Sequence, residues 1–83
     1  MWKRIRNRRL GNNISIIYKN KKYGLSLELF RDSTWGKTDN MNVIVRDINE
    51  KSFESNLGKP ILTKHFGSES QAKYFAKNYM RRN

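Results

Sequence analysis

The residues with the clearest capacity for chemistry are the basic ones, since 18 Lys and Arg stand against 7 Asp and Glu and give this 83-residue chain a formal net charge of +11. They gather at the two ends of the chain. Residues 1–27 hold eight basic residues and residues 70–83 hold four, and neither segment contains an acid. Such segregation indicates a polyanionic partner, most often nucleic acid. A generally basic surface that only aids solubility is the alternative.

Twelve basic side chains are the expected contacts to nucleic acid, because Lys and Arg neutralise phosphates and release their counterions. Eleven come from the two ends of the chain and one, Arg46, from its centre. The set is Lys3, Arg4, Arg6, Arg8, Arg9, Lys19, Lys21, Lys22, Arg46, Lys73, Lys77 and Arg81.

Catalytic and metal-binding patterns are weak. His65 is the only histidine, there is no cysteine, and the carboxylates are scattered singly. A metal site needs several ligands at suitable spacing, and a phosphate loop needs clustered glycines, whereas these glycines are isolated. The sequence therefore predicts no enzyme, no cofactor and no metal site, with His65 in a structural or solvent-facing role.

The cellular location is inferred from three absences. The chain has no cysteine for disulfides and no apolar run near the roughly 20 residues of a membrane span. The basic start is not followed by the apolar segment of a signal peptide. We expect a soluble cytoplasmic protein without a membrane partner.

The fold class is predicted from hydrophobic periodicity. Residues 14–19 and 23–31 alternate as two strands of a hairpin, with Tyr23 in phase with the leucines and Asn20 in a left-handed turn position. Residues 41–48 alternate as a third strand. Residues 69–81 carry an apolar stripe of helical period behind Ser68, a residue suited to the N-cap, with Phe75 as the main core contact. The prediction is an α+β fold in which an antiparallel three-stranded β-meander packs on one C-terminal helix. Residues 61–66 are the candidate for a fourth strand, at the edge of the sheet.

Residues 1–13 are predicted to be a basic N-terminal arm, and residues 14–83 a single domain. The arm has only Trp2 and Ile5 as large apolar groups near its start. Trp2 is expected to tuck against the sheet edge, with stacking on a base as the alternative. Deleting residues 1–9 should then leave the melting temperature nearly unchanged.

A helix on one face leaves the other sheet face open, and a sheet can enter the major groove of duplex DNA. The expected residues on that face are Ser15, Lys19, Ser26, Asn42 and Arg46, with Lys21 and Lys22 at the hairpin tip. Glu28 shares the face and is unfavourable near phosphates. Duplex DNA is thus favoured over RNA, whose bases would instead stack on aromatic side chains. The aromatic candidates are Tyr18, Tyr23, Phe30 and Trp35.

The segment 65–79, HFGSESQAKYFAKNY, carries a family resemblance, with Phe66, Gly67, Ser68 and Ala72 at the positions of a Phe-x-Ser/Thr-x-x-x-Ala pattern. Together with the order of basic segment, strands and helix, it resembles the arm-site-binding N-terminal domain of phage and transposon tyrosine integrases. The resemblance implies a three-stranded sheet that binds duplex DNA and an origin in a phage or mobile element. No catalytic domain is present in these residues, so it implies DNA binding without recombination.

A protein partner is the alternative from another class. The cationic ends would bind an acidic surface on a host protein, and a free sheet edge would add a strand to it. This reading describes a small phage- or plasmid-encoded regulator. The sequence does not indicate an oligomeric state.

Overall fold

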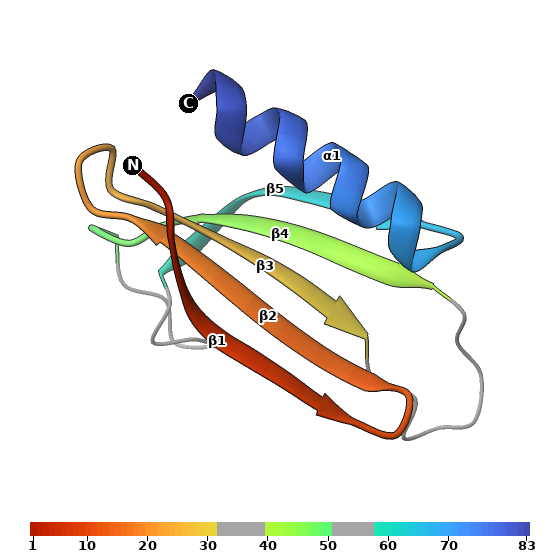
Figure 1. Cartoon of the computed structure of the whole chain (residues 1–83). Coiled ribbons are helices and arrows are strands. Elements are labelled where there is room, and N and C mark those ends of the chain that lie inside the picture. Colours follow the sequence, from red (N-terminus) through yellow and green to blue (C-terminus); the bar gives the residue numbers. More distant parts are fainter. Residues whose placement is uncertain (32–39, 51–57) are drawn as a thin grey trace.

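The chain forms one antiparallel sheet with a single helix on one face, and the computed structural model describes residues 1–31, 40–50 and 58–83 (Figure 1). The strands are β1 (Lys3–Leu10), β2 (Asn13–Asn20), β3 (Leu25–Arg31), β4 (Met41–Asp47) and β5 (Lys59–Phe66), and the helix is α1 (Glu69–Arg82). Strand order follows chain order from β1 to β5. The α+β meander with its C-terminal helix is therefore confirmed, but the sheet has five strands rather than three or four.

The strand that sequence reasoning missed is β1. It pairs with β2 from Lys3 opposite Lys19 to Leu10 opposite Asn13. Gly11, with a φ of 62°, occupies the first position of the two-residue turn between them, where a positive φ favours glycine. The free arm predicted for residues 1–13 is thus wrong for its main part, because residues 3–10 are an edge strand. Deleting residues 1–9 removes that strand, so the expectation of unchanged stability no longer holds.

The other strands begin and end near their predicted limits. β3 starts at Leu25, so Tyr23 belongs to the preceding turn and is exposed instead of sharing the leucine face. Asn20 does not adopt a left-handed conformation; its buried side-chain Oδ1 accepts hydrogen bonds from the backbone N–H groups of Lys22 and Tyr23 at 3.1 and 3.3 Å. The weakly patterned residues 61–66 do form an edge strand, which extends back to Lys59.

The core lies between α1 and the sheet. Alternate residues of β2, β3 and β4 point toward the helix, and Ala72 and Ala76 of α1 are almost fully buried against them. Small side chains at these two positions let the helix lie close to the sheet, as their spacing predicts. The buried sheet residues are Ile14, Ile16, Leu27, Leu29, Met41, Val43 and Val45.

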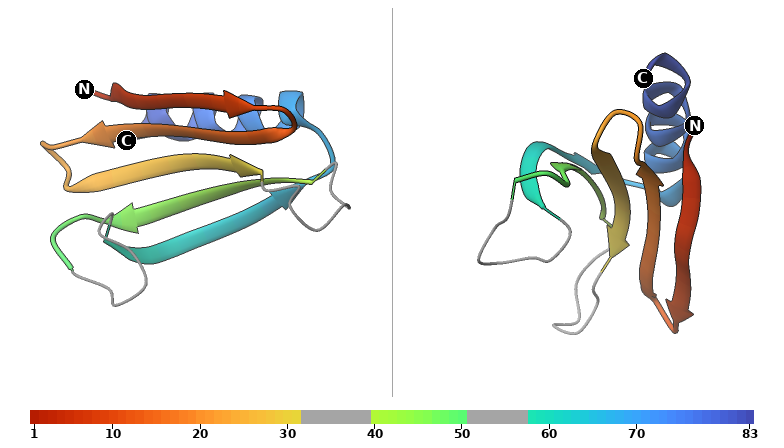
Figure 2. Two further views of the ribbon diagram at one scale, coloured as in Figure 1. Left: turned by 90° about the horizontal axis from the view of Figure 1, so that it is seen from below. Right: turned by 90° about the vertical axis from the view of Figure 1, so that its left-hand side faces the viewer.

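The helix begins at the predicted cap. Ser68 has an extended backbone, and its hydroxyl accepts a hydrogen bond from the Gln71 N–H at 3.3 Å. The backbone of α1 lies close to β3, β4 and β5. The first strand contacts the helix region through side chains, those of Arg9 in β1 and of Trp2 just before it. The helix runs antiparallel to β1, and the two chain termini lie at the same end of the molecule (Figure 2).

Candidate nucleic-acid interface

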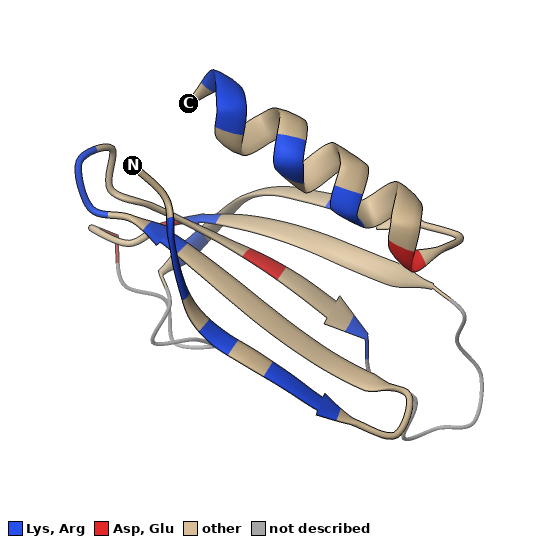
Figure 3. Ribbon diagram, in the orientation of Figure 1, with Lys and Arg blue, Asp and Glu red and all other residues tan. Residues whose placement is uncertain are grey.

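The cationic surface consists of the exposed Lys and Arg side chains of β1, the β2–β3 turn and α1. Figure 3 shows the Lys and Arg positions along these three elements and one acidic position at the start of the helix, where Glu69 stands in the first turn. The members are Lys3, Arg4, Arg6, Arg8, Arg9, Lys21, Lys22, Lys73, Lys77, Arg81 and Arg82. Ten of the twelve basic residues expected from the sequence therefore lie on these three elements. Three of the ten, Lys3, Arg6 and Arg8, are on the sheet face opposite the helix, which they share with Lys19 and Arg46.

A β-bulge divides the β1 side chains between the two faces of the sheet. Arg4 pairs with Tyr18, and after the register shift Asn7 pairs with Ile16 and Arg9 with Ile14. Those partners are residues of the helix-facing side of β2, so Arg4, Asn7 and Arg9 point to the same side. Without the bulge Arg4 would lie on the other face, because successive side chains of a strand alternate.

These side chains form one wall of the β1–α1 groove, a hollow of about 490 Å³. Lys73 and Lys77, one helical turn apart, supply charge to the opposite wall. The floor is mainly apolar and is formed by Ile16, Tyr18, Leu29, Ala76 and Met80. The groove thus combines cationic walls with a surface that can cover an apolar group.

Both ends of the groove are bridged by contacts between β1 and α1. At one end Arg9 pairs with Glu69, with Nη2 and Oε2 2.5 Å apart. At the other, the Trp2 indole N–H donates to the backbone carbonyl oxygen of Asn83 at 2.9 Å, and its ring lies edge-on to Tyr79 with the centroids 6.4 Å apart. Trp2 therefore packs against the protein, but at the C-terminal end of α1 rather than at the sheet edge where it was expected. The two contacts thus join the ends of β1 and α1.

Glu69 neutralises part of this charge. Its carboxylate also pairs with Lys73, with Nζ and Oε2 2.7 Å apart. Hydrogen bonds from Arg9 and then Lys73 lower the pKa of Glu69 from 4.5 to about 2, and the same carboxylate raises the pKa of Arg9. Arg4, Asn7 and Lys77, in contrast, have no hydrogen-bond or ion-pair partner among the described residues. The open charge of the groove is therefore at Arg4 and Lys77.

The opposite sheet face differs from the expectation of an open DNA-reading surface. Ser15, Ser26, Glu28 and Arg46 do share that face, as their register shows. Its centre, however, is buried: Ser26 is fully covered, and Glu28 and Arg46 are 8% and 9% exposed. The Arg46 guanidinium donates to Glu28 at 2.8 Å, and the Ser15 hydroxyl donates to the same carboxylate at 3.2 Å. Arg46 therefore has an internal partner and is not presented to solvent.

Two further residues of that face were expected at the interface. Lys19 is half-buried opposite Lys3, and Asn42 is half-buried opposite His65. The side-chain Oδ1 of Asn42 hydrogen-bonds the Nδ1 of the exposed His65. His65 thus contributes a polar contact between β4 and β5.

The aromatic candidates for base stacking are dispersed. Tyr18 lies half-buried in the groove floor, Tyr23 is exposed with the Lys22 ammonium 5.8 Å from its ring centroid, and Phe30 is half-buried on the opposite face. Trp35 lies outside the described residues. Of the described candidates, Tyr18 is the one that the structure brings together with the groove cations.

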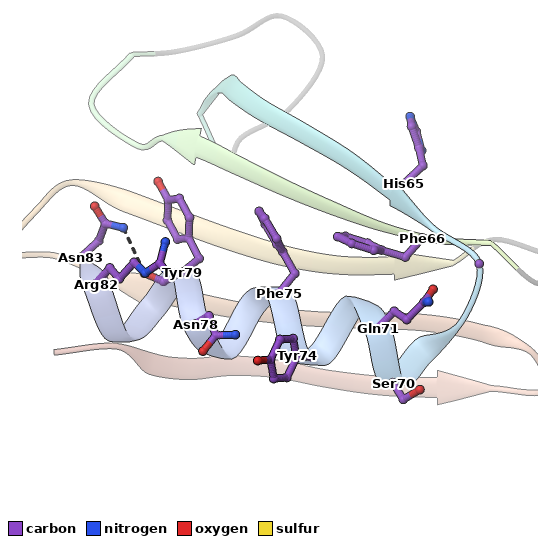
Figure 4. A pocket seen from close by; sticks show the side chains of 11 residues that line it. His65, Phe66, Ser70, Gln71, Tyr74, Phe75, Asn78, Tyr79, Arg82 and Asn83 are labelled. Atoms are coloured by element: carbon purple, nitrogen blue, oxygen red, sulfur yellow. Dashed lines mark hydrogen bonds between the residues drawn. The ribbon is translucent and has the colours of Figure 1, made fainter.

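A second hollow, of about 820 Å³, lies between α1 and β5 (Figure 4). It is aromatic in character: the rings of Phe66 and Phe75 are 5.3 Å apart between centroids, and Phe75 stacks on Tyr79 at 6.3 Å. Among its described lining residues Arg82 is the one Lys or Arg. This side of the helix therefore lacks the charge of the β1–α1 groove.

Within residues 1–31, 40–50 and 58–83, no three His, Asp or Glu side chains are grouped so that they could bind a metal ion. Over the same ranges, no helix has the length and apolar character needed to cross a membrane.

Sequence reasoning missed Asn7 and Glu69 as residues of the candidate site. The signal for Asn7 was the Gly11-Asn12 pair, which is typical of a two-residue hairpin turn and would have placed residues 3–10 in the sheet. No sequence signal brings Glu69 to Arg9, 60 positions away in the chain.

A scan of protein-family models and searches of curated proteins and solved structures find no significant match to this chain.

Proposed function

We propose that the protein binds nucleic acid through the cationic surface. The observation that carries this proposal is that the two basic chain ends lie side by side, since Arg4 and Arg9 of β1 and Lys73 and Lys77 of α1 line one groove and the other basic residues of both elements flank it. Lys and Arg side chains on neighbouring elements follow a phosphate backbone better than the same charges scattered over the protein. The similarity of residues 66–72 to DNA-binding integrase domains favours the same class of ligand.

The interface is proposed on the β1–α1 side rather than on the open sheet face. Base reading by the sheet would require accessible donors, whereas Arg46 is committed to Glu28. The cationic surface instead presents long, flexible charged side chains, which are suited to phosphates. We therefore expect affinity for DNA or RNA with a weak dependence on sequence.

An acidic protein is the competing partner. Strand addition at a sheet edge receives little support, because β1 carries five basic residues and β5 carries Lys59, Pro60 and Lys64. Charges and proline on edge strands disfavour pairing with another chain. A protein partner would then be bound by side-chain charge alone, and a polyglutamate peptide is a suitable probe for that case.

The proposed function is tested by fluorescence anisotropy with labelled 20-nucleotide single-stranded DNA and a 20-base-pair duplex, at about 50 and 200 mM salt. About five phosphate contacts would weaken duplex binding roughly 500-fold over this fourfold change in salt. Polyglutamate of equal charge serves as the competitor. Stronger binding of polyglutamate than of either nucleic acid at both salt concentrations would contradict the proposal.

A further inference from the structure

We infer that the β1–α1 groove is a site for an unpaired segment of nucleic acid, with phosphates at its cationic walls and a base against its floor. The inference rests on the proposed function and concerns which form of nucleic acid this part of the surface accepts.

The charged walls of the groove favour an anionic ligand. Arg4 and Lys77 face the groove without partners among the described residues, and Arg9 and Lys73 add charge that is shared with Glu69. No Asp or Glu is among the described residues that line the groove, and Glu69, which pairs with Arg9 and Lys73, lies at its end. A phosphate between β1 and α1 would meet cations from both sides.

The floor selects a ligand with a flat or apolar part. Tyr18 and Met80 offer a half-buried aromatic ring and a polarisable thioether beneath the charged walls. Aromatic side chains bind exposed bases by stacking, which tolerates any base. Free inorganic phosphate would leave this apolar surface uncovered, whereas a nucleotide would cover it. A volume of about 490 Å³ lies in the range of small-molecule sites and is far too small for a duplex.

Asn7 adds a group that can contact a base edge. It lies in the groove between Arg4 and Arg9 and has no partner among the described residues. Its amide presents both donors and an acceptor. A single strand can turn a base toward this amide and the floor, but a duplex keeps its bases stacked inside, so only its phosphates would reach the walls.

The experiment compares binding of a 20-nucleotide single strand and its 20-base-pair duplex by anisotropy, using matched pairs of variants. Asn7→Glu places a carboxylate between the cationic walls, and Thr63→Glu makes the same charge change on the exposed strand β5. Both positions are solvent-facing strand residues, and thermal melts establish that each variant is folded. Arg4→Gln with Lys77→Gln removes two groove charges, and Arg8→Gln with Arg81→Gln removes two charges outside it.

We expect Asn7→Glu to weaken single-strand binding about tenfold or more, since stacking of one base alone contributes a factor of that order. Thr63→Glu should change it less than about threefold. The groove double variant should reduce single-strand affinity more than the outer double variant, and the two should affect the duplex alike.

Equal effects of Asn7→Glu and Thr63→Glu on the single strand, with nucleic-acid binding intact, would overturn the groove assignment and leave the proposed function standing. Equal losses of single-strand affinity in the groove double variant and the outer double variant would also overturn the groove assignment and leave the proposed function standing. A protein that binds polyglutamate or anionic lipid vesicles at about 50 mM salt, but neither form of DNA, would overturn the inference and the proposed function together.

Discussion

The buried pair between Arg46 and Glu28 gives the sharpest test of how charge is divided between the core and the binding surface. The two side chains are 11% and 10% exposed and lie 2.8 Å apart. Arg46→Ala would leave the Glu28 carboxylate buried, with the Ser15 hydroxyl as its remaining hydrogen-bond donor among the described residues. Removing one partner of a buried pair costs about 3–5 kcal/mol.

That loss is large for this chain. At about 0.05–0.15 kcal/mol per residue, the whole domain has roughly 4–12 kcal/mol of stability. A loss of about 3 kcal/mol lowers the melting temperature of a domain of this size by about 12 °C or more. Urea unfolding followed by circular dichroism measures the free energy directly, and Arg81→Ala, at an exposed helix position, is the control with an expected change within about 0.5 kcal/mol.

A double substitution tests whether the stability loss comes from the charge that is left buried without its partner. Arg46→Met combined with Glu28→Met replaces the pair by apolar side chains, which is often neutral or stabilising, so the double variant should recover most of the stability lost in Arg46→Ala. Measured where the proteins are folded, Arg46→Ala should bind duplex DNA within about twofold of the unaltered protein. A stability loss below about 1 kcal/mol together with a tenfold loss of DNA affinity would show that Arg46 is a ligand contact and would refute this reasoning.

Three further changes test the groove and the sheet. Glu69→Gln frees two groove cations and should strengthen nucleic-acid binding, with a log–log salt slope for duplex DNA steeper by up to about 1.8; an unchanged slope would show that neither cation reaches a phosphate. Because the pKa of Glu69 is lowered from 4.5 to about 2, its stabilising contribution is complete above about pH 4.5 and is lost as the pH falls toward 2, so the unaltered protein should lose more stability across that window than Glu69→Gln. Gly58→Ala should cost about 2 kcal/mol or more in urea unfolding, because the glycine has a φ of 105° and a Cβ there would lie 2.2 Å from the Asp47 carbonyl oxygen. Gly67→Ala should be nearly neutral, because a Cβ there would lie in ordinary contact, 3.9 Å from the Gln71 Oε1. Deleting residues 1–9 should lower the melting temperature by about 8 °C or more, since an edge strand is lost, and an unchanged melting temperature would show that β1 contributes no stability.

The predictable part of the fold is the part with one buried face. β2, β3 and β4 alternate because one side of each contacts the helix, and α1 shows a helical stripe for the same reason. β1 has no such pattern, because as an edge strand it exposes both its faces. Its many charges therefore led to the prediction of a flexible arm. The sequence signal for this strand was the Gly11-Asn12 pair, which is typical of a two-residue turn between two strands.

The candidate site was predictable in its residue types but not in its arrangement. Segregated charge identified the basic residues of both chain ends. Their meeting around one groove depends on the bulge after Arg4 and on the helix running antiparallel to β1, and neither has a sequence signature. The exposure of Arg46 was misjudged because burial on the second face of a sheet depends on tertiary packing that strand alternation does not record.

The salt dependence of binding tests the central claim most directly. With about five phosphate contacts on the cationic surface, the log–log slope should be near −4.5 for duplex DNA and near −3.5 for a single strand, which corresponds to roughly 500-fold and 130-fold weaker binding over a fourfold rise in salt. A folded protein that shows no binding to either form near 100 mM salt, or a slope close to zero, would contradict a nucleic-acid interface on β1 and α1.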